Sequence, residues 1–259
     1  MKPGSLVVVG TGIKAVAQTT QEAVAHMRRA DLLLYLVFDP VTEVWLRDLN
    51  PTASSLRSSY AVGRPRRETY SELVNRILEP VRRGLRVCWA TYGHPGLCAE
   101  SGHAAVRQAR SEGYRAIMLP GVSCDDALFA DLGVDPARYG CQHYDATNFV
   151  LCDRRFDPHA SLILWQIGLL GQADYREVFS SAGLPLLFEM LTATYGPQHV
   201  VTLYEAAVYA VCDPVMQHLP LEDLASVDLR WSMTLYVPPL TAAVPSPVLA
   251  QRLGALLSP

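Results

Sequence analysis

The chain has 259 residues, half of them hydrophobic, and a formal net charge of −3 from 25 acidic and 22 basic side chains. This length supports one large or two modest domains with hydrophobic cores. The near balance of charge argues against a general binder of nucleic acid or of membrane surfaces. No apolar run reaches the roughly 18–20 residues of a membrane span, and the start lacks the apolar core of a signal peptide.

The six cysteines argue for a reducing compartment and against a metal site. They form no C-x-x-C pair, and no histidine cluster completes a zinc-like spacing. We therefore expect a cytoplasmic protein with unpaired thiols and no bound metal. The cysteines are Cys88, Cys98, Cys124, Cys141, Cys152 and Cys212.

The first half of the chain alternates between strand and helix patterns. The pattern predicts strands over 5–9, 32–38, 85–90 and 115–119, and helices from about Thr19, over 70–81 and over 101–111. Thr19 and Glu22 have the spacing of a capping box. The polar stretch 50–67 is expected to be a long loop that covers substrate. Such alternation indicates an α/β domain with a mainly parallel sheet.

The second half is expected to form another α/β domain, with strands of mixed direction. A helix should follow Ser123 to about Leu132, and another should cover 184–195, where Gly196 and Pro197 end it. Strands are predicted over 161–167, 200–204 and 233–237. We predict an N-terminal domain over 1–119 and a C-terminal domain with a tail over 120–259. A cofactor cleft is expected between them.

Two glycine-containing turns, Tyr92–Gly96 and Leu119–Ser123, follow predicted strands and suggest two loops that close on one flat, polar ligand. An earlier turn, Gly10-Thr11-Gly12, lacks the third glycine of a dinucleotide fingerprint and is also compatible with a plain strand–helix connection. His94 lies within the first turn, where a single histidine is more often structural.

Tyr60, Arg66 and Tyr70 lie on the long loop and at the start of its helix. Their ordinary interpretation is structural, because Tyr70 continues an apolar stripe and the neighbouring arginines can be solvated. A guanidinium beside a phenol can nevertheless stabilise an oxyanion and lower the pKa of the phenol, which would make a general base possible.

Together these segments resemble the class III, tetrapyrrole-methylase-like S-adenosylmethionine methyltransferases. Within that class the chain is most similar to the methyltransferase domain of borosin enzymes, which N-methylate backbone amides of ribosomal peptides. The resemblance covers nearly the whole chain. It depends on 7–13, 59–70, 92–96, 118–123, 130–132, 162–168 and 234–238.

The resemblance implies roles for individual residues. It places the family's catalytic set on Tyr60, Arg66 and Tyr70, and it puts Arg57 where the family has a further tyrosine. The positions that it implies for the cofactor, S-adenosylmethionine, with S-adenosylhomocysteine as product, are Gly10, Tyr92, Gly93, His94, Pro95, Ser123, Gln166 and Thr234.

The fungal borosin enzymes continue into a C-terminal core peptide that they methylate themselves, whereas this sequence ends at Pro259. The resemblance therefore implies a split arrangement, in which a separate precursor peptide with its own small helical domain docks on the enzyme. It also implies a homodimer. Two alternatives remain open: a methyltransferase that acts on a tetrapyrrole, a diphthamide-type side chain or another small molecule, and a sensor that binds the cofactor without catalysis.

Overall fold

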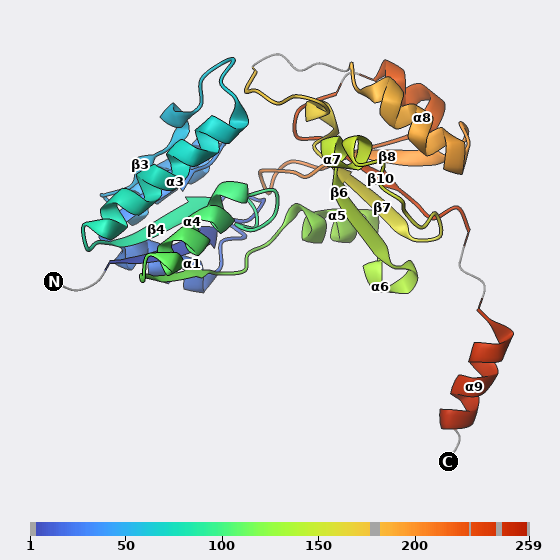
Figure 1. Cartoon of the computed structure of the whole chain (residues 1–259), viewed down its shortest axis with the longest axis horizontal. Helices are drawn as coiled ribbons and strands as arrows, with labels where there is room; N and C mark the ends of the chain where they lie inside the picture. Colours follow the sequence, from blue (N-terminus) through green and yellow to red (C-terminus); the bar gives the residue numbers. More distant parts are fainter. Residues whose placement is uncertain (1–3, 177–181, 228, 242–244, 258–259) are drawn as a thin grey trace. The chain divides into compact units, whose positions relative to one another are not determined.

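The computed structural model describes residues 4–176, 182–227, 229–241 and 245–257, which form two compact units (Figure 1). The first unit holds the chain through Val134 and takes in two later segments, one that begins at Gly171 and one over Tyr204–Met216. The second holds Asp135–Leu170, a stretch that ends at Leu203, and the chain from Gln217. Both contain helices and a β-sheet, so the expected α/β class with two sheets is confirmed.

The first unit extends to Val134 before the chain enters the second, which is 15 residues beyond the predicted boundary at residue 119. Helix α5 (Cys124–Leu132) belongs to the first unit. The Tyr204 hydroxyl, from one of the returning segments, donates a hydrogen bond to Asp131 of this helix at 2.7 Å. The first unit is thus completed by segments that lie far along the chain.

The first unit is built on a parallel five-stranded sheet of order β3-β2-β4-β1-β5. Its strands and helices alternate as the sequence predicts. In chain order they are β1 (Ser5–Gly10), α1 (Gln21–Arg29), β2 (Leu32–Leu36), α2 (Pro40–Leu49), β3 (Ser54–Ser55), the 3₁₀ helix η1 (Arg57–Ser59), α3 (Arg66–Arg82), β4 (Arg86–Thr91), α4 (Glu100–Ser111), β5 (Arg115–Met118) and α5.

Hydrophobic clusters cover both faces of this sheet. Side chains of α3 and α4 pack over one face around the fully buried Leu6 and Trp89, while those of α1 and α2 pack over the other around Leu33 and Tyr35. Successive strand residues point to opposite faces, so strands buried on both sides must be apolar throughout. Because all the strands are parallel, the turns after β1, β4 and β5 emerge at one edge of the sheet.

Three local features differ from the sequence prediction. Thr20, and not Thr19, is the N-cap of α1, because its hydroxyl accepts from Ala23 N–H at 3.1 Å while that of Thr19 donates to the Thr11 carbonyl. Helix α2 was not predicted, although Asp39 caps it and Pro40 begins it. The stretch 50–67 is not one open loop, since β3, η1 and the first turn of α3 occupy part of it.

The second unit contains a sheet of order β6-β7-β10-β8-β9, in which β6 and β7 are parallel and β7 and β10 antiparallel. The predicted mixture of strand directions is confirmed. The remaining elements are α6 (Pro136–Tyr139), β6 (Cys141–Asp145), α7 (Ala146–Leu151), β7 (Ser161–Trp165), η2 (Ile167–Leu169), α8 (Leu184–Tyr195), β8 (Val200–Glu205), β9 (Val215–Pro220), η3 (Leu221–Ser226), β10 (Thr234–Val237) and α9 (Pro247–Leu257).

Helix α8 shows how this unit is held together. Its buried residues Leu184, Leu187, Leu191 and Tyr195 recur at helical spacing, and the helix packs against α7 and η3. Helix α9 occupies the region that the sequence suggests is a tail. None of the helices in the described ranges combines the length and apolarity that crossing a membrane requires.

Candidate active site

Three turns of the first unit meet at the carboxyl edge of its parallel sheet. The N–H of Gly93, after β4, donates to the carbonyl of Gly12, after β1, at 3.0 Å, and the reverse bond measures 3.3 Å. A Cβ atom at Gly10 would lie 2.1 Å from the Gly93 carbonyl oxygen, and one at Gly121 would lie 3.5 Å from the same atom. The absence of a side chain at Gly10 therefore lets the turns after β1 and β4 approach closely, whereas a Cβ atom at Gly121 would make only an ordinary contact.

Gly93 leaves space on this edge that a flat ligand can use. Its φ of +69° is a left-handed conformation that glycine adopts without strain. A Cβ atom built there would meet only Ile13, at 3.4 Å, among the heavy atoms within 4 Å. Gly93 is buried, and a side chain there would make only an ordinary contact, so the turn leaves a small space beside its backbone that fits the edge of a nucleoside-like cofactor. The predicted cofactor positions Gly10, Gly93 and Pro95 all belong to these turns.

Tyr92 and His94 flank Gly93 and have different surroundings. The Tyr92 ring makes an edge-to-face contact with Phe38, with centroids 6.1 Å apart, and burial raises the pKa of its phenol, assisted by Cys124 and Glu205. Tyr92 is therefore a phenol and a hydrogen-bond donor at neutral pH. The Nδ1 atom of His94 accepts the Gly96 N–H at 3.0 Å, which gives this histidine a structural role within the turn.

Ser123 caps helix α5 in a reciprocal capping box. Its hydroxyl accepts from Asp126 N–H at 3.2 Å, while the Asp126 carboxylate accepts from the Ser123 N–H at 2.7 Å. The Ser123 hydroxyl also donates to that carboxylate at 2.7 Å. The buried serine therefore has a full structural explanation, and its contact with a cofactor stays a prediction.

The structure brings Tyr60, Arg66 and Tyr70 together. Tyr60 directly follows η1, whereas Arg66 and Tyr70 are one helical turn apart on α3, and both phenols pack against the core beneath. Burial raises the pKa of Tyr60 to about 12; Tyr70 adds to this effect and Arg66 opposes it. Arg66 thus acts on the Tyr60 pKa in the expected direction, but the net shift is upward because desolvation outweighs the nearby positive charge.

Ser59, next to Tyr60, is anchored by one arginine just before α3 and one on that helix. Arg64 donates to the Ser59 carbonyl at 3.1 Å, and Arg76 donates to its hydroxyl at 2.8 Å. Glu72 pairs with both arginines and has a lowered pKa, chiefly through its hydrogen bond with Arg64. This network fixes the backbone that carries the Tyr60 phenol. Arg57, in η1, is exposed.

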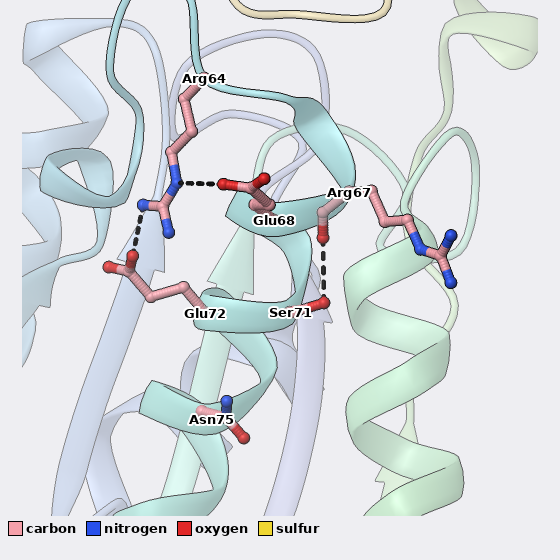
Figure 2. Close-up of a pocket in the computed structure, with 6 residues that line it drawn as sticks. All are labelled: Arg64, Arg67, Glu68, Ser71, Glu72 and Asn75. Atoms are coloured by element: carbon pink, nitrogen blue, oxygen red, sulfur yellow. Dashed lines mark hydrogen bonds and ion pairs between the residues drawn. The ribbon is translucent and has the colours of Figure 1, made fainter.

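A polar surface pocket of about 440 Å³ lies at this end of α3. Figure 2 shows that Arg64 reaches toward Glu68 and Glu72, while the Arg67 guanidinium points away. Arg64 and Glu68 are 3.9 Å apart. None of the three predicted catalytic residues lines the pocket. We therefore assign it to the network that anchors Ser59 and not to the chemistry.

Sequence reasoning missed the segment around Tyr175, which lies beside the three residues. The ring of Tyr175 meets that of Tyr60 edge-to-face, with centroids 5.4 Å apart. Arg66 donates from its backbone N–H to the Ala173 carbonyl at 3.0 Å and from Nε to the Asp174 carbonyl at 3.4 Å. These contacts join residues about 110 positions apart, so no local sequence pattern could predict them.

Gln166 and Thr234 belong to the second unit, at the adjoining ends of β7 and β10. Gln166 has a φ of +59°, which is uncommon for a residue other than glycine and is often retained at functional sites. Ile167 N–H donates to the Met233 carbonyl at 3.3 Å, which brings the two strand ends together. Their cofactor roles stay predictions. Within the described residues, no cluster of three His, Cys, Asp or Glu side chains could hold a metal ion.

Comparison with known proteins supports this picture. Residues 5–166 match the family Tetrapyrrole (Corrin/Porphyrin) Methylases. The chain is 40% identical over 243 residues, or 92% of its length and 58% of the relative's, to the methyltransferase and ribosomally synthesized cyclic peptide dendrothelin A precursor of Dendrothele bispora. It is 36% identical over 261 residues, or 99% of its length and 30% of the relative's, to a methyltransferase and type III borosin cyclic peptide precursor of Anomoporia bombycina.

Both relatives extend well beyond the part that this chain matches, since the chain spans 58% of one and 30% of the other. Among solved structures, a uroporphyrin-III C-methyltransferase from Thermus thermophilus complexed with S-adenosylhomocysteine superposes with a TM-score of 0.63 at 16% identity. That superposition covers 92% of this chain and 98% of the other. At this identity the likeness concerns the fold alone.

Proposed function

Because this chain belongs to the tetrapyrrole methylase family, we propose that it is an S-adenosylmethionine-dependent methyltransferase that repeatedly N-methylates the backbone amides of a ribosomally made peptide. The relatives named as methyltransferases and cyclic peptide precursors support the peptide substrate. The observation that carries the proposal is the grouping of two phenols and a guanidinium at Tyr60, Arg66 and Tyr70.

The residues proposed to hold the cofactor in the first unit are those of the glycine turns. Gly93 offers a left-handed backbone position, and the Tyr92 phenol beside it is a hydrogen-bond donor at neutral pH. When bound, the cofactor supplies an electrophilic methyl group and one positive charge. In this proposal Gly10, His94, Pro95 and Ser123 shape the same edge, and Gln166 and Thr234 are further cofactor positions.

An amide nitrogen is a poor nucleophile, because its lone pair is shared with the carbonyl group. Removal of the N–H proton gives an imidate whose negative charge lies mostly on oxygen. A site for this reaction needs a base near nitrogen and hydrogen-bond donors near oxygen. We propose that Tyr60 removes the amide proton or relays it to another acceptor. We assign the stabilisation of the imidate oxygen to Arg66 and Tyr70.

The acid–base state of Tyr60 sets a condition on this assignment. With a pKa of about 12, Tyr60 is a neutral phenol at pH 7 in the free protein. An added positive charge nearby favours the phenolate. Arg66 already acts in this direction, so the loaded site is the state in which Tyr60 is the stronger candidate for the base.

A further part of the proposal concerns the source of the peptide substrate and the oligomeric state of the enzyme. We propose that the chain accepts a separate precursor peptide and that it works as a homodimer. The named relatives join methyltransferase and precursor in one polypeptide. Mixing this chain with a separate peptide tests the first point, and the mass of the complex in solution tests the second.

The experiment is incubation with S-adenosylmethionine and a panel of short hydrophobic peptides, read by tandem mass spectrometry. The proposal predicts successive mass increases of one methylene group, with fragment ions that place each methyl on a backbone nitrogen. Methylation of a tetrapyrrole but of no peptide would contradict it. So would cofactor binding without any formation of S-adenosylhomocysteine across the peptide panel.

A further inference from the structure

The segment Ala173–Tyr175 runs alongside the start of α3 like a short added strand. Gly63 N–H donates to the Tyr175 carbonyl at 2.8 Å, Tyr175 N–H donates to the Arg64 carbonyl at 3.0 Å, and Arg66 N–H donates to the Ala173 carbonyl at 3.0 Å. Pro65 and Asp174 form the antiparallel bridge at the centre of this ladder. The backbone between Tyr60 and Arg66 is thus paired with a distant part of the chain.

That pairing matters because the connection between the two residues has little packing of its own. Ala61, Val62 and Gly63 are all exposed, and the Val62 side chain is 65% accessible. Gly63 also has a left-handed φ of +76° with open space around it. The backbone hydrogen bonds to residues 173–175 therefore hold the exposed connection between Tyr60 and Arg66 in place.

The Tyr175 side chain completes the arrangement. Its ring lies at 66° to the Tyr60 ring, with centroids 5.4 Å apart, so it limits the rotation of the phenol. Both rings are partly buried. The backbone carbonyl of neighbouring Asp174 accepts from Arg66 Nε, so the same segment contacts both reacting groups.

We propose that Tyr175 is a positioning residue for methyl transfer: its ring fixes the Tyr60 phenol, while the backbone beside it fixes Arg66. This rests on the roles proposed above for Tyr60 and Arg66. The ring and not the hydroxyl carries the effect, since the contact is between aromatic rings. Replacement by phenylalanine should therefore preserve function, whereas replacement by leucine should not.

The activity test compares Tyr175→Phe and Tyr175→Leu with the unmodified chain. We expect Tyr175→Phe to keep kcat within about twofold. We expect Tyr175→Leu to lower kcat about tenfold or more, because a displaced catalytic group loses its alignment, with an unchanged Kd for S-adenosylmethionine. Water admitted to Tyr60 should also lower its pKa and so move the rising part of the pH profile to lower pH. Tyr139→Leu, on α6, is the matched control and should behave as the unmodified chain.

A second measurement does not depend on catalysis. With 3-fluorotyrosine at position 60, the ¹⁹F resonance should be displaced by the neighbouring ring in the unmodified chain and in Tyr175→Phe. It should move toward the free amino-acid position in Tyr175→Leu. An unchanged resonance in Tyr175→Leu would overturn the inference even if no substrate were found. Equal loss of kcat in the Phe and Leu variants would also overturn it, because the hydroxyl would then be required.

Discussion

Gly12 and Gly93 exchange a pair of backbone hydrogen bonds, at 3.0 Å and 3.3 Å, that tie the turn after β1 to the turn after β4. The close approach extends to Gly10, whose missing side chain leaves room for the Gly93 carbonyl. This edge of the sheet is therefore assembled from backbone atoms. Substitutions that add even one carbon there should be costly.

Gly10→Ala should lower the free energy of unfolding by about 1–3 kcal/mol, the usual cost of overpacking, and should abolish cofactor binding. The reason is that the new Cβ atom would lie 2.1 Å from the Gly93 oxygen. Chemical denaturation and calorimetric titration with S-adenosylmethionine measure the two effects. Gly254→Ala, at an exposed position of α9 with open space around it, is the control and should not destabilise the chain. Normal binding by the Gly10 variant would refute a cofactor site at these turns.

Ser123→Ala should lower the free energy of unfolding by about 1 kcal/mol, because α5 loses its N-cap hydroxyl. Ser123→Asn should largely restore it, since asparagine is also a good N-cap. Measuring the Kd for S-adenosylmethionine in both variants separates capping from ligand binding. If the hydroxyl contacts the cofactor, the asparagine variant will regain stability but not affinity. Full recovery of both would leave Ser123 a purely structural residue.

Much of the first unit follows from its sequence, because strands buried on both faces must be continuously apolar and glycine turns must end them. Sequence reasoning also places Tyr60 and Arg66 in the stretch 50–67 and Tyr70 at the start of the next helix, although that helix begins earlier, at Arg66. It cannot find Tyr175, because that contact closes a loop of 115 residues, as 175 minus 60 gives. It finds the lowering effect of Arg66 on the Tyr60 pKa but not the larger effect of burial, since burial is a property of the packed structure.

The pH dependence of catalysis should report the raised pKa of Tyr60. If the phenolate is the reactive form, a pKa of about 12 means that the active fraction grows as pH rises through the accessible range. The kcat/KM value, which reflects the free enzyme, should then increase about tenfold per pH unit between roughly pH 7 and 10. Steady-state rates across that range test this. Tyr60→Phe should lose both the rate and the slope, and a flat profile in the unmodified chain would argue against Tyr60 as the base.

Arg66 provides the strongest test of the chemistry, because its guanidinium is assigned to the charge that develops on the amide oxygen. Arg66→Ala should reduce kcat on the order of 10²–10³-fold, as loss of an oxyanion donor does elsewhere. Cofactor affinity should stay close to normal. Arg67→Ala is the matched control, since Arg67 is the next residue on α3 and its side chain points away from the neighbouring charges (Figure 2).

The most direct measurement is tandem mass spectrometry of one peptide treated in parallel with the unmodified chain, Arg66→Ala and Arg67→Ala at saturating S-adenosylmethionine. The account predicts methyl groups on backbone nitrogens with the unmodified chain and with Arg67→Ala, and essentially none with Arg66→Ala. Undiminished backbone methylation by Arg66→Ala would contradict it, as would methyl groups found only on side chains.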